Sequence, residues 1–104
     1  MKLDLHLKSR VREILKIVQQ VAPGYSVELR IPPYAAIQCV PGSVHRRGTP
    51  PNVVEMGGDT LMELVSNPTC WDEFCHMGRI SAAGTNSNLK DLFTQVSKLD
   101  SSTR

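Results

Sequence analysis

The sequence predicts an α+β fold: a mostly antiparallel or mixed sheet of four to five strands, covered by helices. Three short strand-like runs follow one another between residues 25 and 56, an order that favours antiparallel or mixed pairing over repeated βαβ units. Helical spacing of apolar residues precedes these runs and returns after them. At 104 residues the chain fits one domain, residues 1–104, in which residues 94–104 are expected to be a polar C-terminal tail.

The first element is an amphipathic helix, expected over about residues 4–21. Its apolar residues recur at helical spacing, polar and mostly basic residues fill the rest of the circumference, and Pro23-Gly24 ends it. A basic amphipathic helix can lie on an anionic membrane. We expect instead that the apolar stripe closes the core, as it does in most surface helices.

Four runs are predicted to be strands of one sheet, because each is a short β-compatible segment bounded by turn residues. These runs are Ser26–Ile31, Ala35–Val40, Asn52–Met56 and Arg79–Ala83. The first alternates strictly between polar and apolar residues, as a half-buried strand does.

Three helices are predicted in the second half of the chain. Asp59 is expected to cap a short helix, and Thr69 a second one that Gly78 stops. Apolar spacing from Leu89 to Val96 predicts a last helix, followed by the polar tail.

Composition and charge narrow the class of function. Residues 1–47 hold eight Lys and Arg against three acids, and residues 48–78 hold five acids and no base, which is uneven but far short of a nucleic-acid-binding surface. No run approaches the roughly 18 apolar residues of a membrane span, so integral membrane association is not expected. The three cysteines and the lack of an apolar signal segment at the start predict reduced thiols and a cytoplasmic location.

Candidate catalytic and metal-binding groups are sparse. Cys70 and Cys75 are five residues apart on a predicted helix and diverge by about 140° around its axis, and no second ligand pair has zinc spacing, so no metal site is expected. A Cys–His nucleophile could pair Cys39 with His45, or Cys75 with His6. We expect no catalytic residue, no cofactor and no enzyme activity, and a small Cys/His enzyme remains the third alternative.

The pair Arg46 and Arg47, followed by Gly48, is a candidate anion site. Two guanidinium groups beside an open backbone can bind a phosphate or a carboxylate. The alternative is a solvated loop in which an arginine pairs with Glu55. Glu55 lies at the far end of the following strand, some ~20 Å or more away if that strand is extended. We therefore predict that the arginines bind the head group of an acidic ligand.

Two stretches carry a family resemblance: residues 30–39 (RIPPYAAIQC) and residues 45–55 (HRRGTPPNVVE). They resemble the small bacterial, actinobacterial branch of the sterol carrier protein family, and the similarity extends over roughly residues 10–93. The resemblance implies a sheet on which helices close over an apolar cleft that holds sterols, fatty acids or acyl-coenzyme A thioesters. The same fold also occurs as a non-catalytic accessory domain of enzymes, and the family provides no invariant catalytic residues.

We therefore predict non-catalytic binding, and by extension transport, of an apolar ligand such as a lipid, fatty acid, acyl-coenzyme A or sterol, in a cleft between sheet and helices. Besides the two arginines, its walls are expected from the apolar sides of the two middle helices, namely Leu61, Leu64, Val65, Trp71 and Phe74. The short polar segment 94–104 supports an alternative, a non-catalytic accessory or interaction module without a ligand. A homodimer is left open.

Overall fold

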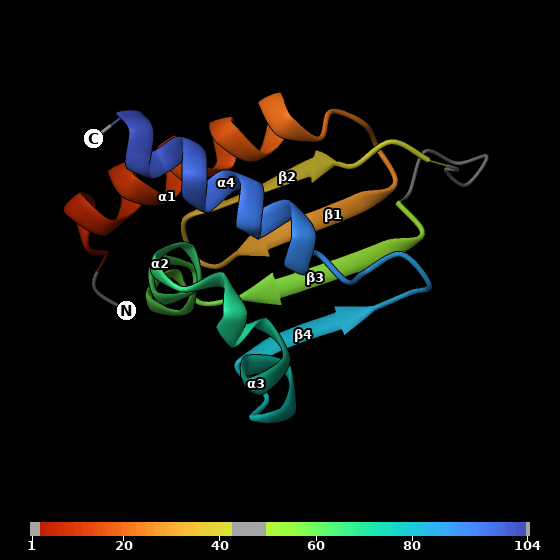
Figure 1. The fold of residues 1–104 in the computed structure, drawn as a ribbon. Coiled ribbons are helices and arrows are strands. Elements are labelled where there is room, and N and C mark those ends of the chain that lie inside the picture. The colour runs from red at the N-terminus through yellow and green to blue at the C-terminus, as the bar shows by residue number, and fades with distance from the viewer. Residues whose placement is uncertain (1–2, 43–49, 104) are drawn as a thin grey trace.

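The computed structural model describes residues 3–42 and 50–103 and confirms the predicted α+β class. The elements follow in the order α1 (Leu5–Val21), β1 (Val27–Ile31), β2 (Ala35–Cys39), β3 (Asn52–Met56), α2 (Gly58–Ser66), the 3-10 helix η1 (Pro68–Cys70), α3 (Trp71–His76), β4 (Ile80–Ala83) and α4 (Lys90–Thr103) (Figure 1). The first helix and all four strands are thus confirmed to within one residue of the predicted bounds.

The four strands form one mixed sheet with the order β2-β1-β3-β4. β1 pairs antiparallel with β2, β3 pairs antiparallel with β4, and the central pair β1–β3 is parallel. Leu29 in the middle of β1 is therefore opposite Ile37 on one side and Val54 on the other. The chain has to cross from the β2 edge past β1 to reach β3, so residues on either side of this crossover meet at one end of the sheet.

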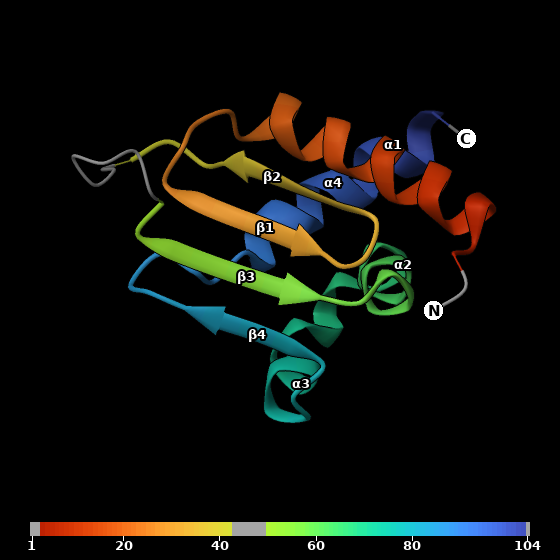
Figure 2. The same cartoon turned by 180° about the vertical axis from the view of Figure 1, so that it is seen from behind.

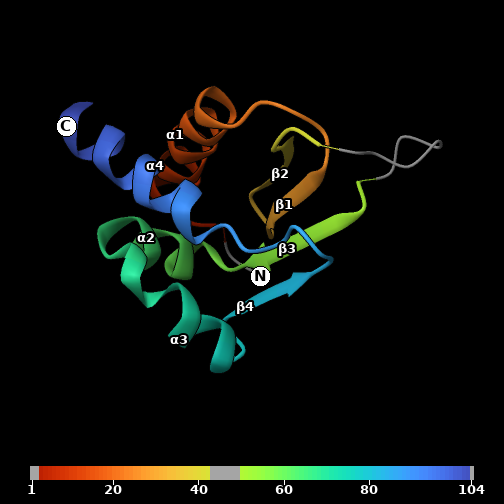
Figure 3. The ribbon, with the colours of Figure 1, turned by 45° about the vertical axis from the view of Figure 1, so that its right-hand side comes forward.

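The helices lie on one face of the sheet, which is clear from behind and from the side (Figures 2 and 3). Alternation along β1 explains this arrangement, because Leu29 and its apolar neighbours are fully buried under the helices while Arg30 points to the opposite face. On that opposite face Arg30 forms an ion pair with Glu28 and a second one with Glu55, at 3.9 Å between Nη1 and Oε1. The face of the sheet under the helices is therefore apolar, and the opposite face is charged.

Two predicted helix caps are wrong. Gly57, not Asp59, is the N-cap of α2, because Gly58 already packs in the first turn, where a Cβ would come within 3.0 Å of Leu7 on α1. Asp59 lies within that turn, where the helix dipole favours a carboxylate. Thr69 lies inside η1, because the chain turns into a 3-10 helix at the preceding proline.

The predicted stop at Gly78 is confirmed as a Schellman motif. The residue adopts φ +78°, and its N–H donates to the carbonyl of Cys75 at 3.1 Å. The N–H of Arg79 donates to the carbonyl of Phe74 at 2.9 Å, which satisfies the end of α3.

The polar tail predicted over residues 94–104 is wrong for the residues described, because α4 continues to Thr103. Val96 is fully buried, and Asp100 forms a two-pronged ion pair with Arg10 of α1, at 3.2 and 3.0 Å. The side chains of Arg10 and Asp100 are only 14% and 10% exposed. Arg10, 90 positions away in the sequence, therefore holds the end of α4, whose own composition gives little reason for it to be ordered.

Candidate functional site

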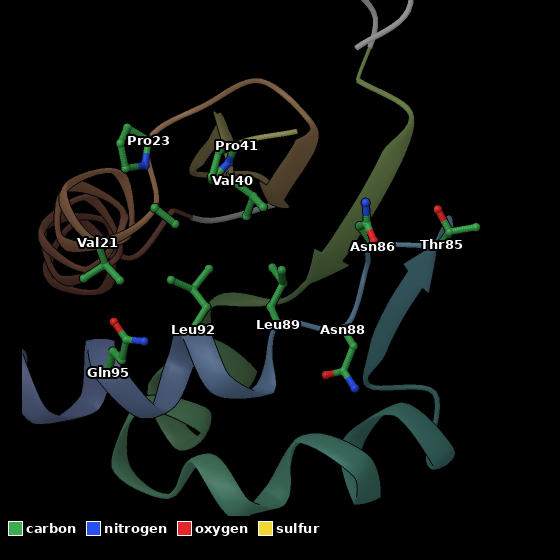
Figure 4. A pocket seen from close by; sticks show the side chains of 11 residues that line it. Val21, Pro23, Val40, Pro41, Thr85, Asn86, Asn88, Leu89, Leu92 and Gln95 are labelled. Atoms are coloured by element: carbon green, nitrogen blue, oxygen red, sulfur yellow. The ribbon is translucent and has the colours of Figure 1, made fainter. Parts of the chain in front are cut away.

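A pocket of about 670 Å³ opens between the end of α1 and the start of α4 (Figure 4). We call it the α1–α4 pocket. Its apolar lining residues are Val21, Ala22, Pro23, Val40, Pro41, Leu89 and Leu92. Its polar lining residues are Thr85, Asn86, Asn88 and Gln95. The lining thus comes from three chain segments, residues 21–23, 40–41 and 85–95, which the crossover of the sheet brings to one end.

The side chains of the pocket converge from opposite walls. In Figure 4 Leu92 of α4 and Leu89, just before that helix, point toward Val40, and Val21 points from α1 toward Gln95. The polar residues of the loop after β4 lie at the other end of the lining. The pocket therefore has an apolar middle with neutral hydrogen-bonding groups beside it.

The wall at Val40 has an unusual backbone. Val40 adopts φ +67°, a left-handed conformation that is rare for a β-branched residue. Its N–H donates to the carbonyl of Ala22 at 2.7 Å, and its carbonyl accepts from both the N–H and the hydroxyl of Ser26, at 3.1 and 2.8 Å. Gly24 lies so close that a Cβ there would come within 2.2 Å of the Val40 carbonyl oxygen. These contacts fix the strained wall in place.

The opposite wall depends on one buried amide. Asn52, only 2% exposed, donates from Nδ2 to the carbonyl of Ser26 at 2.8 Å and accepts at Oδ1 from the N–H of Asn86 at 3.0 Å. Gly84, at φ +112°, passes so close that a Cβ would come within 2.1 Å of Oδ1. Asn52 therefore ties the start of β1 to the loop that leads into α4.

The hydrogen-bonding chemistry of the pocket is neutral. None of its described lining side chains ionises in the usual pH range. Asn88 Oδ1 already accepts from the N–H of Lys90 at 3.0 Å, at the start of α4. Thr85 and Gln95 contribute a hydroxyl and an amide, each of which can donate and accept.

The five apolar residues predicted as ligand contacts lie in the core. Leu61 and Leu64 are fully buried, and Val65, Trp71 and Phe74 are 5%, 2% and 6% exposed. The structure brings them together, but none of them lines the α1–α4 pocket. The Trp71 ring stacks on Phe93 of α4, with ring centroids 6.2 Å apart.

The other two predicted ligand residues, Arg46 and Arg47, lie outside the described residues, as does His45. The pocket residues that sequence reasoning missed are those of turns, above all Pro41 and Asn86. A signal was present, since Pro23-Gly24, Pro41-Gly42 and Gly84 each end an element. The sequence pattern did not predict the crossover from β2 to β3, which brings these three ends together.

The thiols of Cys39 and Cys75 are poor nucleophiles. Cys39 is fully buried in β2, and burial raises its pKa to about 11, so that the neutral thiol is the form present near neutral pH. Burial, and the nearby Asp72 carboxylate, also raise the pKa of Cys75. His6 is exposed on α1. Among residues 3–42 and 50–103, no cluster of three or more His, Cys, Asp or Glu side chains could hold a metal ion.

Fold and pocket together define a small α+β protein whose helices cover one sheet face and leave an amphipathic pocket at one end. A family model described as bacterial SCP ortholog matches residues 5–94. The chain therefore belongs to this family of sterol-carrier-like proteins. A comparison with curated proteins gives no match. Within the part of the chain that the structure describes, no helix has the length and apolar character needed to cross a membrane.

Proposed function

We propose that the protein binds an apolar small molecule of the lipid, fatty-acid, acyl-coenzyme A or sterol type in the α1–α4 pocket. The observation that supports this most is the pocket itself, whose volume of about 670 Å³ is in the usual range for small-molecule sites. Its mixed lining would receive an apolar body and a polar end group. The proposal is one of binding and transport without chemistry, in the cytoplasm.

The proposed pose follows from the lining. The apolar body would lie against Val21, Leu89 and Leu92, and a hydroxyl or amide would exchange hydrogen bonds with Asn86 or Gln95. Neutral partners suit a neutral end group, because burying an unpaired charge is far more costly than burying a paired polar group. The Trp71 cluster would then support the α4 wall from within the core, through Phe93.

Replacing Leu92 by glutamate is expected to weaken binding of both a fatty acid and a sterol at least about tenfold, because it places a charge in the apolar wall. The measurement is a titration of the purified protein with each ligand, by displacement of a fluorescent fatty acid. Leu99→Glu is the matched control, since Leu99 lies on the same helix, 43% exposed, and does not line the pocket.

Equal losses in L92E and L99E would place the ligand elsewhere or indicate a damaged α4, which a comparison of melting temperatures separates. Native mass spectrometry after expression in a lipid-rich host tests the proposal independently. A carrier retains a ligand of defined mass that L92E lacks. Protein that is ligand-free in both forms and binds neither probe would favour the accessory-module alternative.

The arginine pair gives a prediction that depends on ligand charge. Arg46 follows Pro41 of the pocket by five residues in the sequence, and five residues of extended chain span at most about 18 Å. Replacing Arg46 and Arg47 by alanine is expected to weaken a fatty acid or acyl-coenzyme A about tenfold or more, because a charge-assisted contact contributes roughly 1.5–3 kcal/mol. An uncharged sterol should bind as before. Equal losses for both ligand types would indicate damaged folding, and no loss for either would make the pair ordinary solvated residues.

A further inference from the structure

A second groove, of about 380 Å³, lies between α1 and the outer edge of β2. We call it the α1–β2 groove. On the helix side it is lined by Arg12, Leu15, Lys16 and Gln19, and on the strand side by residues 34–37. α1 runs alongside β2 in the same direction (Figure 2). The N–H of Asp4 donates to Tyr34 Oη at one end, and Gln19 Nε2 donates to the Gln38 carbonyl at the other, both at 3.4 Å.

The strand that forms one wall of this groove has an open edge. β2 pairs with β1 on one side, and no other described strand pairs with it. On the side away from β1, the Gln38 carbonyl accepts a hydrogen bond from Gln19 Nε2. On the same side, the Val40 N–H donates to the Ala22 carbonyl. Because peptide groups alternate in direction along an antiparallel strand, the N–H and carbonyl of Ala36 point to the same open side. Ala36 is exposed, so this peptide edge is accessible to another chain.

The helix wall of the groove carries positive charges that no described acidic side chain neutralises. Arg12 and Lys16 form no ion pair with any described residue, and Lys8 is one turn before them. The one acid nearby on α1, Glu13, is paired with Arg10 at 3.7 Å. Two cations four residues apart on a helix are separated by about 6 Å along its axis. Side chains on one face of a strand recur about every 6.8 Å, which is nearly the same spacing.

We infer that the α1–β2 groove binds an extended acidic segment of a partner protein, which adds to β2 as a further strand. Its peptide groups pair with Ala36, and acidic side chains at alternate positions face Arg12 and Lys16. Unpaired cations, an open strand edge and matching spacings favour this occupant. The groove is separate from the α1–α4 pocket, and none of its lining residues is shared with it.

A membrane surface is the competing partner for a basic helix. Insertion of α1 would require its apolar stripe to be available. Val11, Ile14 and Val18 are fully buried, however, and Leu15 is 3% exposed. Apart from Leu5 in its first turn, which is 71% exposed, the helix therefore presents charge with little apolar area, which suits an acidic peptide better than a bilayer.

The test uses a labelled hexapeptide with blocked ends and the sequence Thr-Glu-Val-Glu-Val-Thr, titrated into the full chain by fluorescence anisotropy. We expect saturable binding, and none for the peptide with lysine in place of glutamate. Strand addition further predicts that N-methylation at positions 2 and 4, or at positions 3 and 5, abolishes binding while the other set is tolerated, because only alternate N–H groups face β2. Equal affinity of the two N-methylated peptides would overturn strand addition.

The site is tested with the double variant R12Q/K16Q, which should weaken the peptide about fivefold or more at low salt. K98Q/R104Q removes the same two kinds of charge from the last seven residues of the sequence and should bind as the wild type does. L92E should also bind the peptide normally, because it affects only the α1–α4 pocket. Equal losses in the two charge variants would overturn the assignment to this groove. Sedimentation with phosphatidylglycerol vesicles that R12Q/K16Q abolishes, without peptide binding, would replace the peptide by a lipid surface.

Discussion

Replacing Asn52 by leucine is expected to lower the free energy of unfolding by about 3–5 kcal/mol, because it leaves one buried and one partly buried backbone group unpaired, at about 1–3 kcal/mol each, and adds a poor fit. The two groups are the Ser26 carbonyl and the Asn86 N–H. Leucine has as many side-chain heavy atoms as asparagine, but its two methyl groups are bulkier than the planar amide, and Gly84 leaves no room beside it. Urea unfolding followed by circular dichroism measures the change.

The same variant should also loosen the pocket. Hydrogen exchange at the Asn86 amide should accelerate to the rate of an open loop, and ligand affinity should fall with it. Val53→Leu is the control, since Val53 is the next residue and points to the opposite face of β3, half-buried. A loss below about 1 kcal/mol in Asn52→Leu would show that the amide does not order this end of the sheet.

The second large effect is expected at the ion pair of α1 and α4. Asp100→Ala should lower the free energy of unfolding by about 2–3 kcal/mol, somewhat less than breaking a fully buried pair, because both side chains keep a little exposure. The Arg10 guanidinium would remain under α4 with only the exposed Glu13 carboxylate, at 3.7 Å, as its partner. Its hydrogen bond with Asp100 raises the pKa of Arg10 above the already high ordinary value, so it cannot escape by losing a proton.

A double variant separates the contribution of the Arg10–Asp100 ion pair to stability from that of the apolar packing of α4. Arg10→Leu combined with Asp100→Leu should recover most of the loss, since an apolar pair has no desolvation penalty. Thermal unfolding of the wild type, Arg10→Leu, Asp100→Leu and the double variant forms a double-mutant cycle. If Asp100→Ala alone is neutral, the last turns of α4 are held by Val96 and its apolar neighbours rather than by charge.

Much of the fold could be predicted from local pattern. The alternation of β1, the turn residues around each strand and the helical spacing of α1 are all short-range signals, and they gave bounds correct to one residue. The apolar sides of α2 and α3 were correctly assigned as inward-facing. In the structure they are buried in the core. The sequence pattern could not distinguish this from a cleft wall, because an apolar helix side looks the same in both cases.

The features that local pattern could not predict are those that depend on distant partners. Apart from Leu99, residues 98–103 are polar, and the ion pair of Asp100 with Arg10 that holds them against α1 has no local sequence signal. The parallel pairing of β1 with β3 brings Pro23, Pro41 and Asn86 to one end of the sheet, although each reads only as part of a turn. A pocket built from turns carries no periodicity, and so no sequence signal of its own.

The contacts of α4 also determine when, during synthesis of the chain, the core can be completed. Phe93 and Val96 of this helix are fully buried between the other elements, and α4 packs against α1 and α2. A nascent chain that has released α1 and the whole sheet from the ribosome still lacks the helix that closes the core. Its apolar surfaces, including Trp71 without Phe93, must wait for α4 to emerge. Folding of this protein is therefore expected to be completed only after α4 has left the ribosome.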